Sequence, residues 1–143
     1  LHEHKHRLLL SLKKPGKVTA HASEYVRILV AAGNPGNATS VLKDVWQYEP
    51  DFRLDDPGSA LAVARVFHQQ QDFRAARRVL ANLHRDHPEF EQLGEAYLLL
   101  AKVYLEGYDS RDHVKRILGF LRKNRPEVLD SEEGHYLRRM LVD

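Results

Sequence analysis

Residues Asp72–Pro88, DFRAARRVLANLHRDHP, contain a turn, a helix with small and apolar residues on one side, and a closing proline. The same pattern ends upstream at Pro50 and downstream at Pro126, so three closing prolines follow one another at intervals of 38 residues. A fixed period of this length is typical of chains built from repeated helical hairpins. The sequence therefore predicts a repeat architecture.

Four apolar positions in the second helix of each unit recur at the same interval. They are Ala38, Ala76 and Val114; Val41, Val79 and Ile117; Leu42, Leu80 and Leu118; and Val45, Leu83 and Leu121. One hairpin cannot bury its apolar face alone, so successive hairpins are expected to stack and to share a core.

Helix-start signals complete the expected secondary structure. Asp55-Asp56-Pro57 combines an acidic N-cap with a proline in the first turn, and Ser131 precedes two glutamates at the start of a last helix. No segment alternates apolar and polar residues as a strand would, so the chain is predicted to be all-α. Residues 1–16 are expected to form a leader or a short helix. Its histidines, His2, His4 and His6, are expected to be solvated rather than to form a metal-binding cluster.

Composition restricts the possible functions. The net charge of +2 is too weak a bias to indicate a nucleic-acid partner. Cysteine is absent, which excludes disulfides and cysteine-based zinc sites, and no apolar run approaches the ~20 residues that cross a bilayer. No glycine-rich phosphate loop and no nucleophile with a positioned base is evident, so we expect neither catalytic residues nor a cofactor.

The central unit resembles the tetratricopeptide repeat family. Ala64 and Phe67 match the small and aromatic positions of the first helix, Asp72-Phe73 the turn, Ala76 the small residue of the second helix, and Pro88 the closing proline. The third unit matches through Ala101 and Tyr104 when one extra residue lies in the turn over 107–112. The family period is about 34 residues, and Asp51–Leu54 shows where four more are added, which leaves a related helical-hairpin solenoid as an alternative.

The resemblance implies a right-handed α-solenoid of three antiparallel helical hairpins. The expected units cover about residues 19–50, 57–88 and 94–126, and a capping helix covers 131–142. In such solenoids the first helices line a concave groove that binds a segment of a partner protein.

The groove position just after the small residue of each first helix carries a cation. By the resemblance these are Arg27, Arg65 and Lys102, although a strict 38-residue spacing would put Val103 in the third place. Three cations favour an acidic peptide or a carboxylate terminus, and the alternative is that they are solvated surface charges. The family's carboxylate clamp needs an asparagine at this position, so binding of chaperone tails is disfavoured.

Two further groups of residues suggest sites, but each has a stronger structural interpretation. His84 and His87 could share a metal ion, yet histidine in a last helical turn also complements the helix dipole, so no metal site is predicted. Trp46 and Tyr48 could form an exposed contact patch, and packing on Phe52 is the favoured alternative.

The predicted function is that of a non-catalytic protein-interaction module in the cytoplasm. The alternative is a tail that self-associates or tethers a larger, membrane-bound protein, and the oligomeric state stays open. Since the chain begins with leucine, we expect it to be a processed piece of a longer protein, with membrane contact only through a part outside this sequence.

Overall fold

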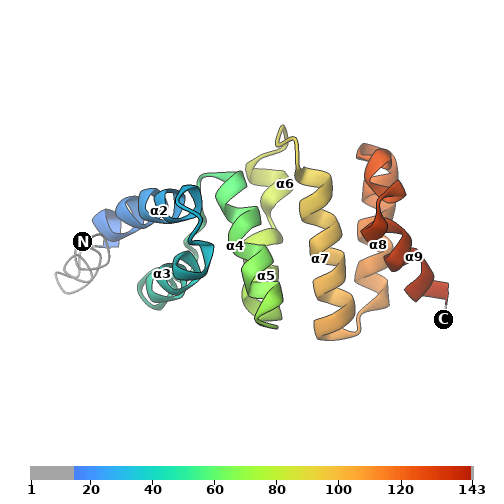
Figure 1. Ribbon diagram of the computed structural model, residues 1–143, viewed down its shortest axis with the longest axis horizontal. Coiled ribbons are helices and arrows are strands. Elements are labelled where there is room, and N and C mark those ends of the chain that lie inside the picture. The colour runs from blue at the N-terminus through green and yellow to red at the C-terminus, as the bar shows by residue number, and fades with distance from the viewer. Residues whose placement is uncertain (1–14, 143) are drawn as a thin grey trace. The chain divides into compact units, whose positions relative to one another are not determined.

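The computed structural model describes the backbone of residues 15–142 and the side chains of residues 21–141. The predicted leader, residues 1–16, lies almost entirely outside the described residues, as do its histidines. Every regular element of the described part is helical, which confirms the all-α prediction (Figure 1). The elements are α2 (Pro15–Ala31), α3 (Pro35–Tyr48), α4 (Pro57–Gln69), α5 (Phe73–Leu80), α6 (Leu83–Asp86), α7 (Leu93–Tyr108), α8 (Arg111–Asn124), the 3-10 helix η1 (Pro126–Asp130) and α9 (Glu132–Val142).

The chain forms two compact units, whose boundary falls inside α4 between Val66 and Phe67. In the first unit α2 packs against α3. In the second unit α7 contacts both α5 and α8, while η1 and α9 pack on α7 and α8. The right-handed superhelix and the division into three hairpins and a capping helix stay predictions, since each unit is described by itself.

Each predicted hairpin turns at a residue with positive φ. These residues are Gly33 (φ 79°), Gln71 (φ 61°) and Asp109 (φ 47°), and they keep the 38-residue interval of the closing prolines. Glycine adopts this left-handed conformation without steric cost. The residues that follow them, Asn34, Asp72 and Ser110, are the N-cap residues of the second helices, so the backbone repeats more regularly than the residue types do.

Side-chain caps stabilise the predicted helix starts. The Asp56 carboxylate accepts hydrogen bonds from the Ser59 backbone N–H at 3.2 Å and from its hydroxyl at 2.6 Å. The Ser131 hydroxyl accepts from the Gly134 N–H at 3.2 Å. Both interactions satisfy donors that a helix leaves unpaired at its N-terminus, and both predicted caps are confirmed.

The recurring positions of the second helices form the core. Three of the four sets are buried in all three units. The fourth set is buried at Val41, whereas Val79 and Ile117 are half-exposed. The two later second helices therefore keep some apolar surface accessible.

The helix expected to run without interruption to Pro88 is broken between α5 and α6. In a continuous helix the backbone N–H of His84 would donate to the carbonyl of Leu80. It donates instead to the hydroxyl of Tyr97 on α7, at 3.1 Å. A side chain that takes the place of a carbonyl acceptor is a recognised cause of helix interruption, and here that side chain comes from another element.

Gly107 was predicted to lie in a turn, but it belongs to α7, which continues to Tyr108. A Cβ atom at this position would lie 2.5 Å from the Cβ of Phe73. The glycine therefore serves close packing rather than chain reversal, which occurs two residues later at Asp109.

The 3-10 helix η1 was not predicted, and two glycines let it pack closely. A Cβ on Gly94 would lie 2.6 Å from a methyl group of Val128, and one on Gly134 would lie 2.5 Å from the Leu129 carbonyl oxygen. The segment after Pro126 thus fits between the start of α7 and the start of α9.

Candidate partner-binding surface

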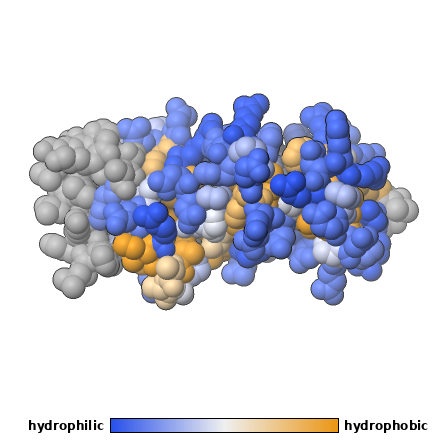
Figure 2. Space-filling view, turned by 90° about the horizontal axis from the view of Figure 1, so that it is seen from above, coloured by the Kyte–Doolittle hydropathy of each residue, from blue (hydrophilic) through white to orange (hydrophobic). Residues whose placement is uncertain are grey.

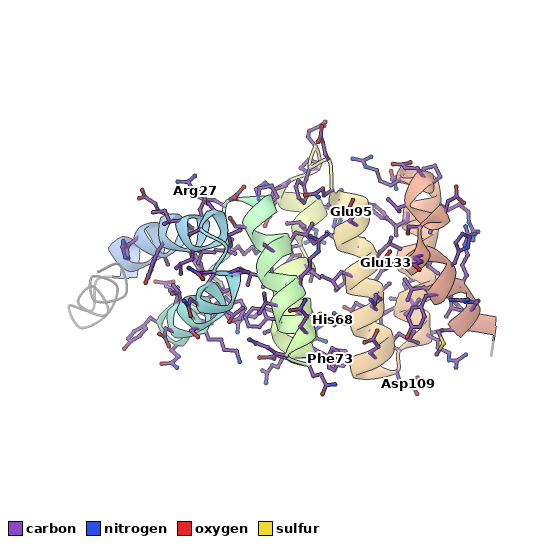
Figure 3. The ribbon with its side chains drawn as sticks, viewed as in Figure 1. Arg27, His68, Phe73, Glu95, Asp109 and Glu133 are labelled. Atoms are coloured by element: carbon purple, nitrogen blue, oxygen red, sulfur yellow. The ribbon has the colours of Figure 1, made fainter. Side chains whose placement is uncertain are left out.

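The three predicted groove cations lie on the three first helices. Arg27 on α2 (labelled in Figure 3) and Arg65 on α4 are exposed, and Lys102 on α7 is half-buried. Arg27 and Arg65 belong to the first unit and Lys102 to the second, so each is placed only within its own unit.

Hydrogen bonds at the helix ends distinguish the two alignments of the third unit. The N–H groups of Asn34 and Asp72 donate to carbonyls five residues earlier, those of Leu29 and Phe67, at 2.8 and 2.9 Å. The N–H of Ser110 instead reaches six residues back to Tyr104, at 3.0 Å. One extra residue therefore lies at the end of α7, which makes Tyr104 equivalent to Phe67.

This register makes Lys102 the equivalent of Arg65. The alternative residue, Val103, is completely buried, so it has no surface to offer a ligand. The one-residue shift inferred from the sequence is thus supported by backbone geometry, although the extra residue sits in the helix end rather than after it.

Acidic residues flank the third cation. Glu106 follows Lys102 by four residues, and Glu95 (labelled in Figure 3) precedes it by seven, so the helical spacing puts all three on one face of α7. Glu106 also contacts Nε2 of His68 at 3.1 Å. The surface around Lys102 is therefore of mixed charge, which the sequence reasoning about single positions missed.

Trp46 packs as the favoured interpretation proposed. Its indole Nε1 donates a hydrogen bond to the carbonyl of Phe52 at 3.1 Å, across the segment that lengthens the repeat. Tyr48 does not share this environment, since its side chain is 48% exposed.

His84 lies in α6, and His87 is the C-cap residue of that helix. Throughout the described residues, no three His, Asp or Glu side chains gather closely enough to hold a metal ion. His84 lies against the rings of Tyr97 and Phe120, with centroid distances of 5.5 and 5.6 Å, and one of its ring nitrogens contacts the Tyr97 hydroxyl. Burial raises the pKa of Tyr97, and the hydrogen bond from the His84 amide partly opposes that shift.

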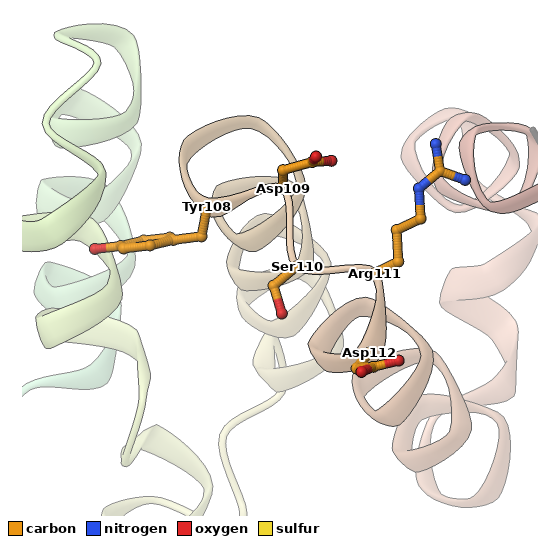
Figure 4. A pocket seen from close by; sticks show the side chains of 5 residues that line it. All are labelled: Tyr108, Asp109, Ser110, Arg111 and Asp112. Atoms are coloured by element: carbon orange, nitrogen blue, oxygen red, sulfur yellow. The ribbon is translucent and has the colours of Figure 1, made fainter.

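A shallow hollow of about 430 Å³ lies at the turn between α7 and α8. Residues 108–112 line it, and Figure 4 shows the side chains of Tyr108 and Arg111 directed to opposite sides of the turn. Ser110 contacts Nδ1 of His113 at 2.5 Å, and the His113 ring stacks on Tyr104 at 4.2 Å. These contacts between side chains of the turn and of the two helices that it joins account for the conformation of the turn.

Within residues 15–142, none of the helices is long and apolar enough to cross a membrane.

Among known families, the tetratricopeptide repeat model matches residues 29–94. This match supports the resemblance of the central repeat to the tetratricopeptide family. Neither the comparison with curated proteins nor that with solved structures found a significant match.

Repeats of this family generally mediate protein–protein interactions, and the family is typically a non-catalytic scaffold. The match runs from the last residues of α2 through α3 and the whole central unit to the start of α7. It therefore includes Arg65 but neither Arg27 nor Lys102.

Sequence reasoning missed the cluster formed by His84, Tyr97 and Phe120. His84 was considered only as a metal ligand or as a helix-end residue and Phe120 was given no role, because 13 and 23 positions separate the three residues along the chain. One signal in the sequence could have indicated the cluster. The segments that form α6, α7 and α8 each carry an aromatic or imidazole ring, and neighbouring helices of the repeat were already expected to pack together.

Proposed function

We propose that this protein is a non-catalytic interaction module that binds a segment of a partner protein along its first helices. The observation that carries the proposal is the equivalence of Arg27, Arg65 and Lys102, which the hydrogen-bond register of the helix ends supports. Equivalent cations on successive repeats would meet carboxylates spaced along one extended or helical segment.

The partner segment would be acidic mainly where it meets the first two cations. Near Lys102 the flanking carboxylates of Glu95 and Glu106 favour a polar segment of mixed charge, because like charges placed together reduce affinity. The two ends of the proposed groove would therefore prefer different sequences, so a partner segment would bind in one orientation.

The test is the binding of a library of short acidic peptides, measured by fluorescence polarisation. An Arg27→Ala/Arg65→Ala variant should bind the selected peptides about 5- to 30-fold more weakly, given ~0.5–1 kcal/mol for each exposed ion pair. A matched control is Arg138→Ala/Arg139→Ala, which removes two exposed cations from α9 and should leave affinity unchanged.

Equal affinities for wild type and the Arg27/Arg65 variant would refute the proposed groove. Sedimentation at two protein concentrations addresses the alternative function. If the sedimentation coefficient rises with protein concentration, and rises equally in wild type and in the Arg27/Arg65 variant, the result would instead favour self-association.

A further inference from the structure

A second surface lies on the opposite side of α7 from Lys102. Tyr97 precedes Lys102 by five residues, and Tyr104 follows it by two, so both tyrosines point well away from the lysine on a helix of 3.6 residues per turn. On the tyrosine side, α6 and α8 approach each other closely enough for the rings of His84 and Phe120 to touch. The proposed groove does not use this side of the molecule.

A cavity of about 200 Å³ opens between these helices. Its walls are mostly apolar and consist of His84, Tyr97, Arg116, Ile117 and Phe120, and we call it the aromatic pocket. The three rings also pack on one another, since Tyr97 and Phe120 have centroids 5.4 Å apart. Mutual ring contacts of this kind fix the wall positions before any ligand arrives.

The Tyr97 hydroxyl and one ring nitrogen of His84, both in the wall, are engaged with each other. The Tyr97 hydroxyl accepts from the His84 backbone N–H and contacts the imidazole ring. What the wall presents is therefore ring surface together with the half-exposed side chain of Ile117. A dry cavity of about 150 Å³ is enough to bind benzene, so the aromatic pocket has room for one aromatic or branched aliphatic side chain.

The helices that flank the pocket are basic. Within α8 there are five basic residues and one acidic residue, and in residues 73–86 four arginines stand against one aspartate. The basic residues are Arg111, Lys115, Arg116, Arg122 and Lys123 on α8, and Arg74, Arg77, Arg78 and Arg85 on α5 and α6. The whole-chain charge of +2 conceals this local excess. Arg116 both lines the pocket and is exposed.

We propose that the aromatic pocket receives one aromatic or branched aliphatic side chain from an acidic segment of a partner protein. Apolar burial in the pocket supplies the anchor, and Arg116 pairs with a carboxylate next to that side chain. The basic character of α8, which carries Arg116, favours acidic sequence on either side of the side chain that enters the pocket. This surface is separate from the first-helix groove, so the protein has two independent contact surfaces.

The test uses a fluorescein-labelled acidic peptide of Asp, Glu and Ser with a single central Phe, and the same peptide with a central Ser. The Phe peptide should bind about tenfold or more tightly than the Ser peptide. Arg116→Glu should weaken binding of the Phe peptide at least fivefold more than Lys115→Glu does. Lys115 is a matched control because it is exposed on the same helix, carries the same charge and does not line the pocket. An Ile117→Trp variant, checked for folding by thermal melting, should fill the pocket and abolish the preference for Phe.

Several outcomes would overturn the proposal. Equal affinity for the Phe and Ser peptides would remove the anchor, and equal weakening by Arg116→Glu and Lys115→Glu would leave only non-specific charge attraction. Loss of binding in Arg27→Ala/Arg65→Ala, with retention in Arg116→Glu, would assign the peptide to the first-helix groove. Tighter binding of a single-stranded oligonucleotide than of the Phe peptide, or self-association abolished by Arg116→Glu, would identify a different occupant.

Discussion

The hydrogen bond from the backbone of His84 to the hydroxyl of Tyr97 provides a sensitive test of how the α5–α6 break is held. Tyr97→Phe keeps the ring but removes the acceptor at 3.1 Å. A part-buried N–H without an acceptor costs about 1–3 kcal/mol, so we expect the free energy of unfolding to fall by roughly 1–2 kcal/mol. In a chain of 143 residues that corresponds to a decrease in Tm of about 2–8 °C.

Urea unfolding, together with amide hydrogen exchange at His84, measures both the global and the local effect. The exchange of the His84 amide should become faster, because the hydroxyl that accepts its hydrogen bond is lost. Tyr104→Phe is the matched control, since Tyr104 lies on the same helix and makes its contacts through its ring, to His113 and Tyr108. Unchanged stability with unchanged exchange in Tyr97→Phe would refute the explanation of the helix break.

The same residue makes the stability depend on alkaline pH. Because burial raises the pKa of Tyr97 in the folded state, its protonated form stabilises the fold fully below the ordinary tyrosine value of about 10. That contribution is lost as the pH rises through the higher folded value, since the unfolded chain releases the proton first. The stability difference between wild type and Tyr97→Phe should therefore shrink above a pH of about 10.

Two further predictions compare matched positions. Gly107→Ala should destabilise the protein by about 1–3 kcal/mol in a urea titration, because its Cβ would collide with Phe73. Gly119→Ala, whose Cβ meets nothing within 4 Å, should stabilise it by about 0.5–1 kcal/mol in the same titration. The reverse order of stabilities would contradict the packing. Asp72→Ala should cost about 1 kcal/mol through loss of its cap on α5, while Asn34→Ala, which removes no side-chain cap, should cost markedly less, and equal losses in thermal melting would show that the cap contributes nothing.

The sequence predicted those parts of the fold that depend on one helix at a time. Apolar residues at helical spacing, with capping residues such as Asp56 and Ser131, located the helices, because each signal acts within a single turn of the chain. The break after α5 could not be found in this way. It depends on a tyrosine 13 residues further along, and the local sequence around His84 is compatible with a continuous helix.

The glycines show a second limit of prediction from the local sequence. Gly33 lies at a turn and has a positive φ, whereas Gly107, which was predicted to lie in a turn, belongs to α7. Gly107 is explained by Phe73, a contact made through tertiary packing. Without that packing, a glycine needed for space cannot be distinguished from one needed for conformation.

For the candidate surface, the sequence placed cations on the first helices but gave no view of their surroundings. The charges near Lys102 became evident only when Glu106 was seen to share its face and to contact His68. The aromatic pocket was likewise inaccessible to single-position reasoning, since α6, α7 and α8 each contribute part of its wall.

The basic character of α5, α6 and α8 has a kinetic consequence. Cations on neighbouring helices of one compact unit create a field that reaches about one Debye length, ~8 Å at physiological ionic strength, and accelerates the encounter with an acidic partner. Added salt should slow association with the Phe peptide while changing its dissociation rate much less, because dissociation requires the anchored side chain to leave the aromatic pocket. The surface charge would thus set how quickly a partner is found, and the pocket would set how long it stays.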